Sequence, residues 1–216
     1  AVISVVGYLI GIFLRKKISV LNPLLVSIIF VIAVIKIFHI DYETYNSGAK
    51  YISYLLTPAT VCLAIPLYRQ ISVLKEHAKE VFIGILAGVL ASMGSILLMS
   101  YLFGLTHEQY VTLLPKSITT AIGMGVSEEL GGIQTITVAV IIITGVLGNI
   151  IAEAVLKIFR IKEPVAKGLA IGTASHAIGT TKALEIGEIE GAMSSLSVAV
   201  AGLMTVISAS IFANMM

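Results

Sequence analysis

The sequence predicts an all-α polytopic membrane protein, because hydrophobic residues form long runs and polar residues gather in two interior stretches. Of the 216 residues, 57% are hydrophobic and only 12% are charged, whereas soluble domains carry about 25% charged residues. The two polar stretches, 113–132 and 168–182, are interrupted by glycines. Polar backbone at membrane depth survives only where it faces protein or a water-filled cavity. We therefore expect about six full spans plus two broken or re-entrant segments.

Four of the expected spans precede the first polar stretch. They are 1–14, 21–38, 51–68 and 81–104. The first is short, since a span needs about 20 residues, and upstream residues absent from this sequence would explain that. The second opens with Asn22 and Pro23, which suit a cap and a first-turn proline. The third contains Pro58 and Pro66, which should kink or break it.

The segments between spans are expected to be mostly loops. Residues 39–50 and 105–110 are polar loops in this prediction, and 69–80 is an amphipathic surface helix. Small residues between 84 and 95 permit close helix packing. The last two expected spans are 134–156 and 191–214.

Lysine and arginine counts predict the orientation. The basic segments 15–17, 69–79 and 157–167 should be cytoplasmic. The stretch 113–132 then either enters and leaves on the outer side or passes through as a broken helix with one further crossing. The stretch 168–182 enters and leaves on the inner side. Two such segments meeting near the middle of the membrane are typical of an elevator-type transporter. We expect one integral-membrane domain over 1–216, with four spans in 1–110 and both broken segments in 111–216.

Several strings in the chain resemble the LrgB/CidB family. They are LLPKSITTAIGMGVSEELGGI, GLAIGTASHAIGTTKA, LNPLLV and LTPATVCLAIPLY. The resemblance covers nearly the whole chain and extends to the C-terminal part of the plastidial glycolate/glycerate translocator. It implies a protein of the bacterial cell membrane. It also implies a possible small membrane partner of the LrgA/CidA type.

Two functions follow from the resemblance as expectations. The first is a secondary carrier or facilitator for small monocarboxylates such as pyruvate, lactate, glycolate or glycerate. The alternative is a holin/antiholin-like protein that regulates murein hydrolase export and cell lysis. The glycine-broken polar stretches favour the carrier, because an oligomeric pore could be built from clean spans. A homodimer is the usual form of an elevator-type carrier.

Other classes of function are not expected. The net charge of +2 is too small to predict nucleic-acid binding. The four histidines, at 39, 77, 107 and 176, are too scattered for a metal cluster, and no G-x-S-x-G motif predicts a nucleophile. The sequence therefore predicts neither an enzyme nor a bound cofactor or metal.

Lys116 is the single cation of the first polar stretch. A charged side chain at mid-membrane costs about 2.5–3.5 kcal/mol, so such a residue is usually functional or paired. Lys116 could bind the substrate carboxylate, or it could reach the outer interface or pair with Glu128 or Glu129. The neighbouring hydroxyls that could join it at the substrate are those of Ser117, Thr119 and Thr120.

His176 is the corresponding residue of the second polar stretch. Because histidine changes charge near neutral pH, His176 could bind a carboxylate or carry a coupled proton. Alternatively, a neutral His176 could hold the segment together through backbone hydrogen bonds. The candidate hydroxyl donors around it are Thr173, Ser175, Thr180 and Thr181.

The remaining candidates are less sharply defined. Glu128 and Glu129 could form a solvated turn at the outer mouth or take part in proton coupling, and Pro58 and Thr60 could lie beside the site. We expect Asn149 to join helices. The last expectations concern charges: Glu153 as a surface carboxylate, and Lys182 with Glu185 at the inner end of the second stretch.

Overall fold

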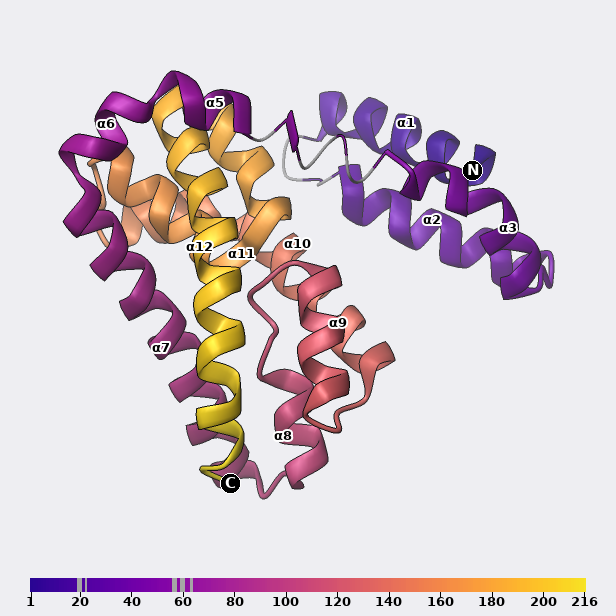
Figure 1. The fold of residues 1–216 in the computed structure, drawn as a ribbon. Coiled ribbons are helices and arrows are strands. Elements are labelled where there is room, and N and C mark those ends of the chain that lie inside the picture. Colours follow the sequence, from indigo (N-terminus) through magenta and orange to yellow (C-terminus); the bar gives the residue numbers. More distant parts are fainter. Residues whose placement is uncertain (19–20, 22, 56–57, 59–60, 63) are drawn as a thin grey trace. The chain divides into compact units, whose positions relative to one another are not determined.

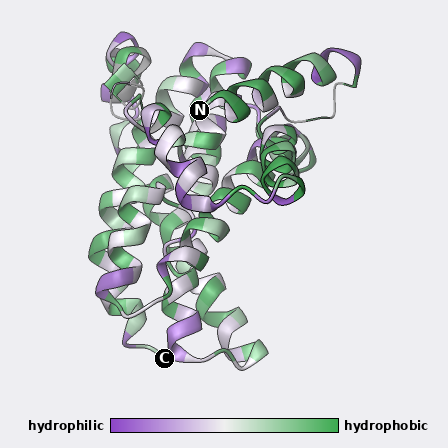
Figure 2. Ribbon diagram, turned by 90° about the vertical axis from the view of Figure 1, so that its right-hand side faces the viewer, coloured by the Kyte–Doolittle hydropathy of each residue, from purple (hydrophilic) through white to green (hydrophobic). Residues whose placement is uncertain are grey.

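The computed structural model describes residues 1–18, 21, 23–55, 58, 61–62 and 64–216, and the regular elements in these residues are all helices (Figure 1). The predicted all-α class is confirmed. The chain forms two compact units, Ala1–Cys62 and Leu63–Met216, which we describe separately. Hydrophobic residues predominate along the helices, and hydrophilic residues gather at helix ends and turns (Figure 2).

The first unit contains α1 (Val2–Lys17), α2 (Pro23–Ile37) and α3 (Tyr42–Ser53). Helices α1 and α2 pack closely at Gly11, where a Cβ atom would lie 2.8 Å from the Cα of Pro23. The expectation of a loop over 39–50 is wrong from Tyr42 onward. The carboxylate of Asp41 accepts a hydrogen bond from the Glu43 backbone N–H at 2.9 Å, and this N-cap starts a helix in a polar segment.

The expected span 51–68 is only partly described. Residues 56–57, 59–60 and 63 lie outside the described part of the chain, so the span stays a prediction. Before these residues, α3 ends at Ser53, and after them α5 covers Ala64–Arg69. The expected surface helix 69–80 is shorter than predicted: α6 covers Ile71–Glu76, and the following helix already begins at Ala78.

Three helices of the described residues are long and apolar enough to cross a membrane. They are α7 (Ala78–Phe103), α10 (Gln134–Ile158) and α12 (Glu188–Ala213). They match the expected spans 81–104, 134–156 and 191–214. Apolar side chains on their outer faces, such as Ile83 and Leu203, are each 64% exposed. Such surfaces suit contact with lipid, and the chain is therefore a helical membrane protein.

The core of the second unit lies between α7, α12 and the segment that follows α7. One face of α7 is buried at intervals of three or four residues, the period of a helix; its members are Val81, Ile85, Val89, Met93 and Ile96. The far ends of α7 and α12 are also tied together, because the Tyr101 hydroxyl donates to the Met215 carbonyl. The two helices run in the same direction in Figure 1.

The first polar stretch forms a hairpin, which we call the first hairpin (residues 107–132). It consists of α8 (His107–Leu113), a turn, and α9 (Thr120–Glu129). The expected loop 105–110 is wrong from His107 onward, because Thr106 and Gln109 form a capping box that starts α8.

The end of the first hairpin lies beside the last turn of α8. The Ile133 N–H donates to the Thr112 hydroxyl at 2.8 Å, and the Thr137 hydroxyl donates to the Thr112 carbonyl at 2.9 Å. The stretch 113–132 therefore begins and ends close together. A re-entrant course of this stretch through the membrane stays a prediction.

The second polar stretch lies within α11 (Pro164–Ile186), which folds back on itself at His176. The backbone of His176 has φ 43° and ψ −145°, which is not helical. A Cβ atom on Gly179 would lie 3.0 Å from Ile171 Cγ2, whereas residues eight apart in an unbroken helix are about 12 Å apart. We call residues 164–186 the second hairpin, with its tip at His176.

The two hairpins meet against the middle of α7. On the second hairpin, the Thr173 side chain packs directly against Gly88. On the first hairpin, the Ser117 hydroxyl is hydrogen-bonded to the Ser92 hydroxyl at 3.0 Å. Because positions 88 and 92 are one helical turn apart, the two polar stretches come together halfway along this helix.

Candidate functional site

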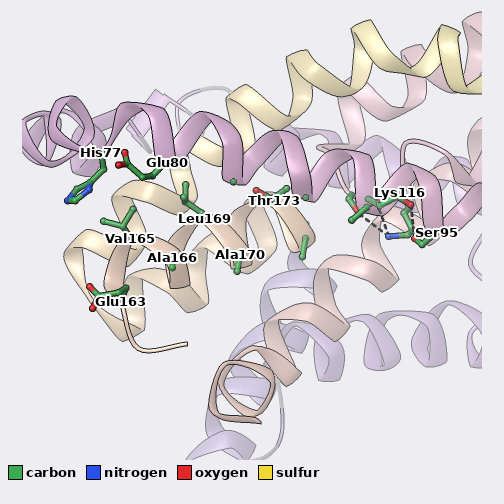
Figure 3. A pocket seen from close by; sticks show the side chains of 16 residues that line it. His77, Glu80, Ser95, Lys116, Glu163, Val165, Ala166, Leu169, Ala170 and Thr173 are labelled. Carbon is green, nitrogen blue, oxygen red and sulfur yellow. Dashed lines mark hydrogen bonds between the residues drawn. The ribbon is translucent and has the colours of Figure 1, made fainter. Parts of the chain in front are cut away.

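A groove of about 770 Å³ runs between α7 and the first arm of the second hairpin (Figure 3). Its mouth is lined by His77, Glu80 and Glu163, at the ends of helices. At the opposite end of the groove lie Lys116 and Ser95. The groove therefore leads from a polar end of the unit to the place where the two hairpins meet.

The walls of the groove are made mostly of small side chains. They are Gly84, Gly88 and Ala91 on α7, and Ala166, Ala170 and Ala174 on α11. At Gly88 the small size is required, because a Cβ atom would lie 2.6 Å from Thr173 Cγ2. The absence of side chains here lets the second hairpin approach α7 and leaves the groove open beside it.

Lys116 supplies the positive charge at the end of the groove where the two hairpins meet. Its Nζ donates to the hydroxyls of Ser92 at 3.3 Å and Ser117 at 3.0 Å. No carboxylate pairs with Lys116 in the part of the chain that the structure describes. An ammonium group has three N–H donors, so one remains for a ligand in the groove.

Hydroxyl groups surround this ammonium. Ser95 donates to the Ser92 carbonyl at 2.7 Å. Thr173 lines the groove, and its Oγ1 is buried without a hydrogen-bond partner among the described residues. A buried hydroxyl left unpaired costs about 1–3 kcal/mol, so Thr173 needs a partner that the described residues do not supply.

The other two hydroxyls predicted beside Lys116 do not line the groove. Thr119 is the N-cap residue of α9 and Thr120 is the first residue of that helix, and both are half-buried. The Thr119 side chain makes no cap hydrogen bond. Of the predicted residues in the first hairpin, Lys116 and Ser117 are the two that reach the groove.

His176 lies against α10, outside the lining of the groove. It is 3% exposed, and its Nε2 is 3.0 Å from the Ile141 carbonyl oxygen. Its ring also packs on Gly145, where a Cβ atom would lie 2.7 Å from the ring. This is the geometry of the alternative interpretation, in which His176 holds the hairpin through a backbone hydrogen bond.

Ser175 and Thr180 are also buried in helix contacts. Ser175 packs on Gly148 of α10, where any side chain would overlap it. The Thr180 hydroxyl donates to the His176 carbonyl at 3.1 Å and bonds to the Ser194 hydroxyl at 2.8 Å. These residues fix the tip of the second hairpin between α10 and α12.

The remaining predicted candidates are two glutamates of the second unit, which do not line the groove, and two residues of the chain before Leu63. Glu128 and Glu129 are exposed at the end of α9. Pro58 is exposed and belongs to the first unit, and Thr60 lies outside the described residues. No group of three or more metal-ligating side chains occurs among the residues that the structure describes.

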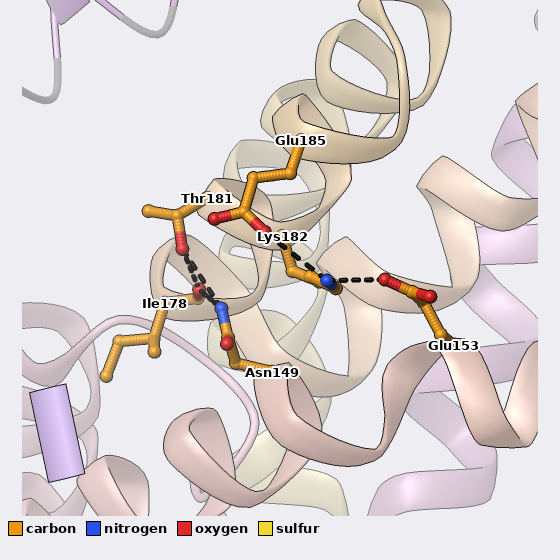
Figure 4. Close-up of polar contacts among 6 residues, drawn as sticks. All are labelled: Asn149, Glu153, Ile178, Thr181, Lys182 and Glu185. Carbon is orange, nitrogen blue, oxygen red and sulfur yellow. Dashed lines mark hydrogen bonds and ion pairs between the residues drawn. The ribbon is translucent and has the colours of Figure 1, made fainter. Parts of the chain in front are cut away.

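The base of the second hairpin is held by polar contacts to α10 (Figure 4). Asn149 donates to the Ile178 carbonyl at 2.9 Å, which confirms its predicted role in joining helices. Lys182 pairs with Glu153 of α10 and, at 3.3 Å, with Glu185. Glu153 is a surface carboxylate, as predicted, with its side chain 64% exposed, and the hairpin presents a lysine to it.

Three residues that line the groove were not predicted from the sequence. Ser92, Ser95 and Gly88 face the groove, but their small size suggested helix packing alone. Their spacing of three and four residues places them on one face of α7, and two hydroxyls on such a face were a usable signal. Glu190 of α12 was also not predicted; it is 7% exposed and pairs with Lys167 at 3.5 Å.

The spans, the two hairpins and the groove that ends at a lysine define a helical membrane protein with a candidate site for a small anion. The chain belongs to the LrgB family, since the model of the LrgB-like family matches residues 4–215. It is 38% identical over 209 residues to the antiholin-like protein LrgB of Bacillus mycoides (strain KBAB4) and to that of Bacillus cereus (strain B4264). Each alignment covers 95% of this chain and 91% of the relative. No solved structure was found to match the chain.

Proposed function

We propose that this chain acts as an antiholin-like membrane protein, which regulates murein hydrolase export and cell lysis. The similarity to the two Bacillus proteins supports this function, because it extends over 95% of the chain and both relatives are named antiholin-like. The three span-length helices fit a protein that acts within a membrane. Among the functions considered, the comparisons favour this one.

The geometry supports a second candidate, a carrier or facilitator for small monocarboxylates such as pyruvate, lactate, glycolate or glycerate. One observation carries it: the Lys116 ammonium lies at the end of an open groove with no carboxylate partner among the described residues. An ammonium at membrane depth is costly unless it is paired. A substrate carboxylate would complete the pair.

The proposed carboxylate site has three parts. The free N–H of Lys116 would bind one carboxylate oxygen, and the serines that already hold Lys116 would fix its direction. Thr173, which also lines the groove, would form part of the wall beside the substrate. The small residues along the groove would let the substrate travel between its mouth and Lys116.

The finer architecture belongs to the same proposal. We propose six spans and an elevator-type movement, in which the second hairpin slides against α7. We also propose a homodimer in the bacterial cell membrane, with a small LrgA/CidA-type protein as a possible partner. A carrier coupled to protons would need a titrating group, and His176, Glu128 and Glu129 are the candidates.

The antiholin-like function is tested by complementation. A Bacillus strain that lacks its LrgB protein should lyse abnormally in stationary phase, and expression of this chain should restore the normal rate of lysis. Expression of the same chain with an early stop codon serves as the control. Lysis that is unchanged by the intact chain would contradict the proposal.

The carrier is tested with the purified chain in liposomes. Uptake of labelled pyruvate should saturate and should exchange with unlabelled pyruvate, whereas an unrelated sugar of similar size should stay outside. Leakage of both solutes without saturation would indicate a pore instead. If no solute crosses even when an LrgA-type partner is added, the carrier is excluded while the antiholin-like function stands.

A further inference from the structure

A second, much smaller cavity lies where the two hairpins meet α7 and α12. Its volume is about 10 Å³, which is the lower limit for one water molecule. Four of the side chains that line it carry hydroxyl groups: Ser92, Ser117, Thr173 and Thr205. A water molecule in such a cavity needs two to four polar partners, and these four residues are positioned to supply them.

The hydrogen bonds already present leave several of these hydroxyls incomplete. Ser92 and Ser117 are bonded to each other at 3.0 Å, and both accept from Lys116. Two hydroxyl groups carry two protons, and only one of these can lie between the two oxygens. The other proton has no acceptor in the described part of the chain.

The two threonines add to this deficit. Thr173 is 7% exposed, and its hydroxyl has no partner among the described residues. Thr205 is 5% exposed, and within the same part of the chain its hydroxyl has no hydrogen bond either. Buried polar groups in native proteins are nearly always paired with protein or with ordered water.

We infer that this cavity binds one water molecule, which bridges Ser117 of the first hairpin and Thr173 of the second hairpin. The water would accept the spare serine proton and the Thr173 proton, and it would donate to the Thr205 oxygen. It would thereby connect the hydrogen bonds of Lys116 to both hairpins and to α12.

A sodium ion would also fit the volume and would bind hydroxyl oxygens. It is disfavoured because Lys116 already donates to two of the four hydroxyls. A second cation bound to the same oxygens would be repelled by the ammonium group. Neutral water meets no such repulsion, and this inference does not depend on which ligand the groove accepts.

A high-resolution density map of the purified full chain tests the inference directly. We expect one isolated peak within about 2.6–3.2 Å of the Ser117 and Thr173 hydroxyls, and its loss in Thr173→Val. A clear map without this peak would overturn the inference.

Thermal unfolding gives an independent test, because a paired and an unpaired Thr173 hydroxyl predict opposite shifts of the unfolding midpoint in Thr173→Val. If water pairs Thr173, the isosteric Thr173→Val change removes a hydrogen bond and lowers the unfolding midpoint. If the hydroxyl is unpaired, the same change removes a buried polar group and raises the midpoint. Ser100→Ala is the matched control. The Ser100 hydroxyl is also buried without a described partner, but it does not line the cavity. The Ser100→Ala variant should therefore lose no stability.

The ion is excluded by the same measurement in two buffers of equal ionic strength. The unfolding midpoint of the unaltered chain should be the same in sodium chloride and choline chloride. A midpoint that rises with sodium, and no longer does so in Thr173→Val, would overturn the inference in favour of a cation site.

Discussion

At the scale of single residues, the structure gives Lys116 and His176 different surroundings, although the sequence suggested a ligand contact for both. Both are polar residues within apolar surroundings, but Lys116 reaches the open groove and His176 is 3% exposed against α10. Lys116 has a free N–H, whereas the His176 ring is already bonded to the Ile141 carbonyl. Substitutions at the two positions should therefore change different properties.

Lys116→Met should weaken anion binding without loss of stability. A hydrogen bond to a charged group contributes about 1.5–3 kcal/mol, which corresponds to roughly a 10- to 150-fold change in the Kd of a carboxylate. Removing a charge that is partly buried should leave the thermal midpoint unchanged or higher. Calorimetric titration with pyruvate and thermal unfolding measure the two effects.

The control for this prediction is Lys79→Met, because Lys79 is exposed in the first turn of α7 and does not line the groove. Its effect on the carboxylate Kd should be less than about twofold. Equal losses in the two variants would show that net charge, rather than the Lys116 site, attracts the anion.

His176 should act on stability more than on affinity. His176→Leu removes the hydrogen bond to Ile141 and should lower the free energy of unfolding by about 1 kcal/mol. His176→Gln can keep a donor near the same carbonyl and should lose less. Both variants keep a side chain at positive φ, so backbone strain cancels between them. A tenfold rise in the carboxylate Kd for His176→Gln at unchanged stability would instead place this residue at the ligand.

At the scale of helices, glycines of α10 determine how the second hairpin docks. Gly145 and Gly148 lie under His176 and Ser175, and a Cβ atom at either position would be too close to these side chains. The hairpin tip thus packs directly on the backbone of α10. The same close approach occurs on α7, where Gly88 meets Thr173.

Gly148→Ala should therefore destabilise the second unit. Alanine normally stabilises a helix interior by about 0.5–1 kcal/mol relative to glycine, but here the methyl group would overlap Ser175 and overpacking costs about 1–3 kcal/mol. Gly94→Ala is the matched control, because its Cβ would meet nothing within 4 Å, and it should raise the thermal midpoint. Two variants that shift the midpoint in the same direction would contradict the docking contact.

The helices also show which features can be predicted from sequence. Hydropathy and length predict α7, α10 and α12, and the polar, glycine-broken stretches predict both hairpins. The short helices α3 and α8 were missed because polar composition was interpreted as loop, although Asp41 and Thr106 are N-cap signals. The groove could not be predicted, because it depends on Gly88 of α7 meeting Thr173, and that pairing between distant segments has no local signal.

At the scale of the second unit, the groove connects a charged end of the unit to the place where the two hairpins meet. Its mouth carries Glu80 and Glu163, beside the basic segments that should be cytoplasmic. Its other end lies at Lys116. We therefore predict that water reaches Lys116 through the groove from the cytoplasmic side.

Cysteine labelling should report this access from the cytoplasmic side. In a Cys62→Ser background, Ala170→Cys places a thiol in the groove, and Leu90→Cys places one on an exposed apolar face of α7 outside the groove. A charged, membrane-impermeant thiosulfonate reacts only with thiols that water reaches, since charged groups are excluded from lipid. We expect it to label Ala170→Cys in inside-out vesicles and not in right-side-out vesicles, and Leu90→Cys in neither.

Pyruvate should slow the labelling of Ala170→Cys if the groove is its path. Labelling of Ala170→Cys from the outer side alone would reverse the predicted orientation, and labelling of both thiols from both sides would indicate a water-filled pore.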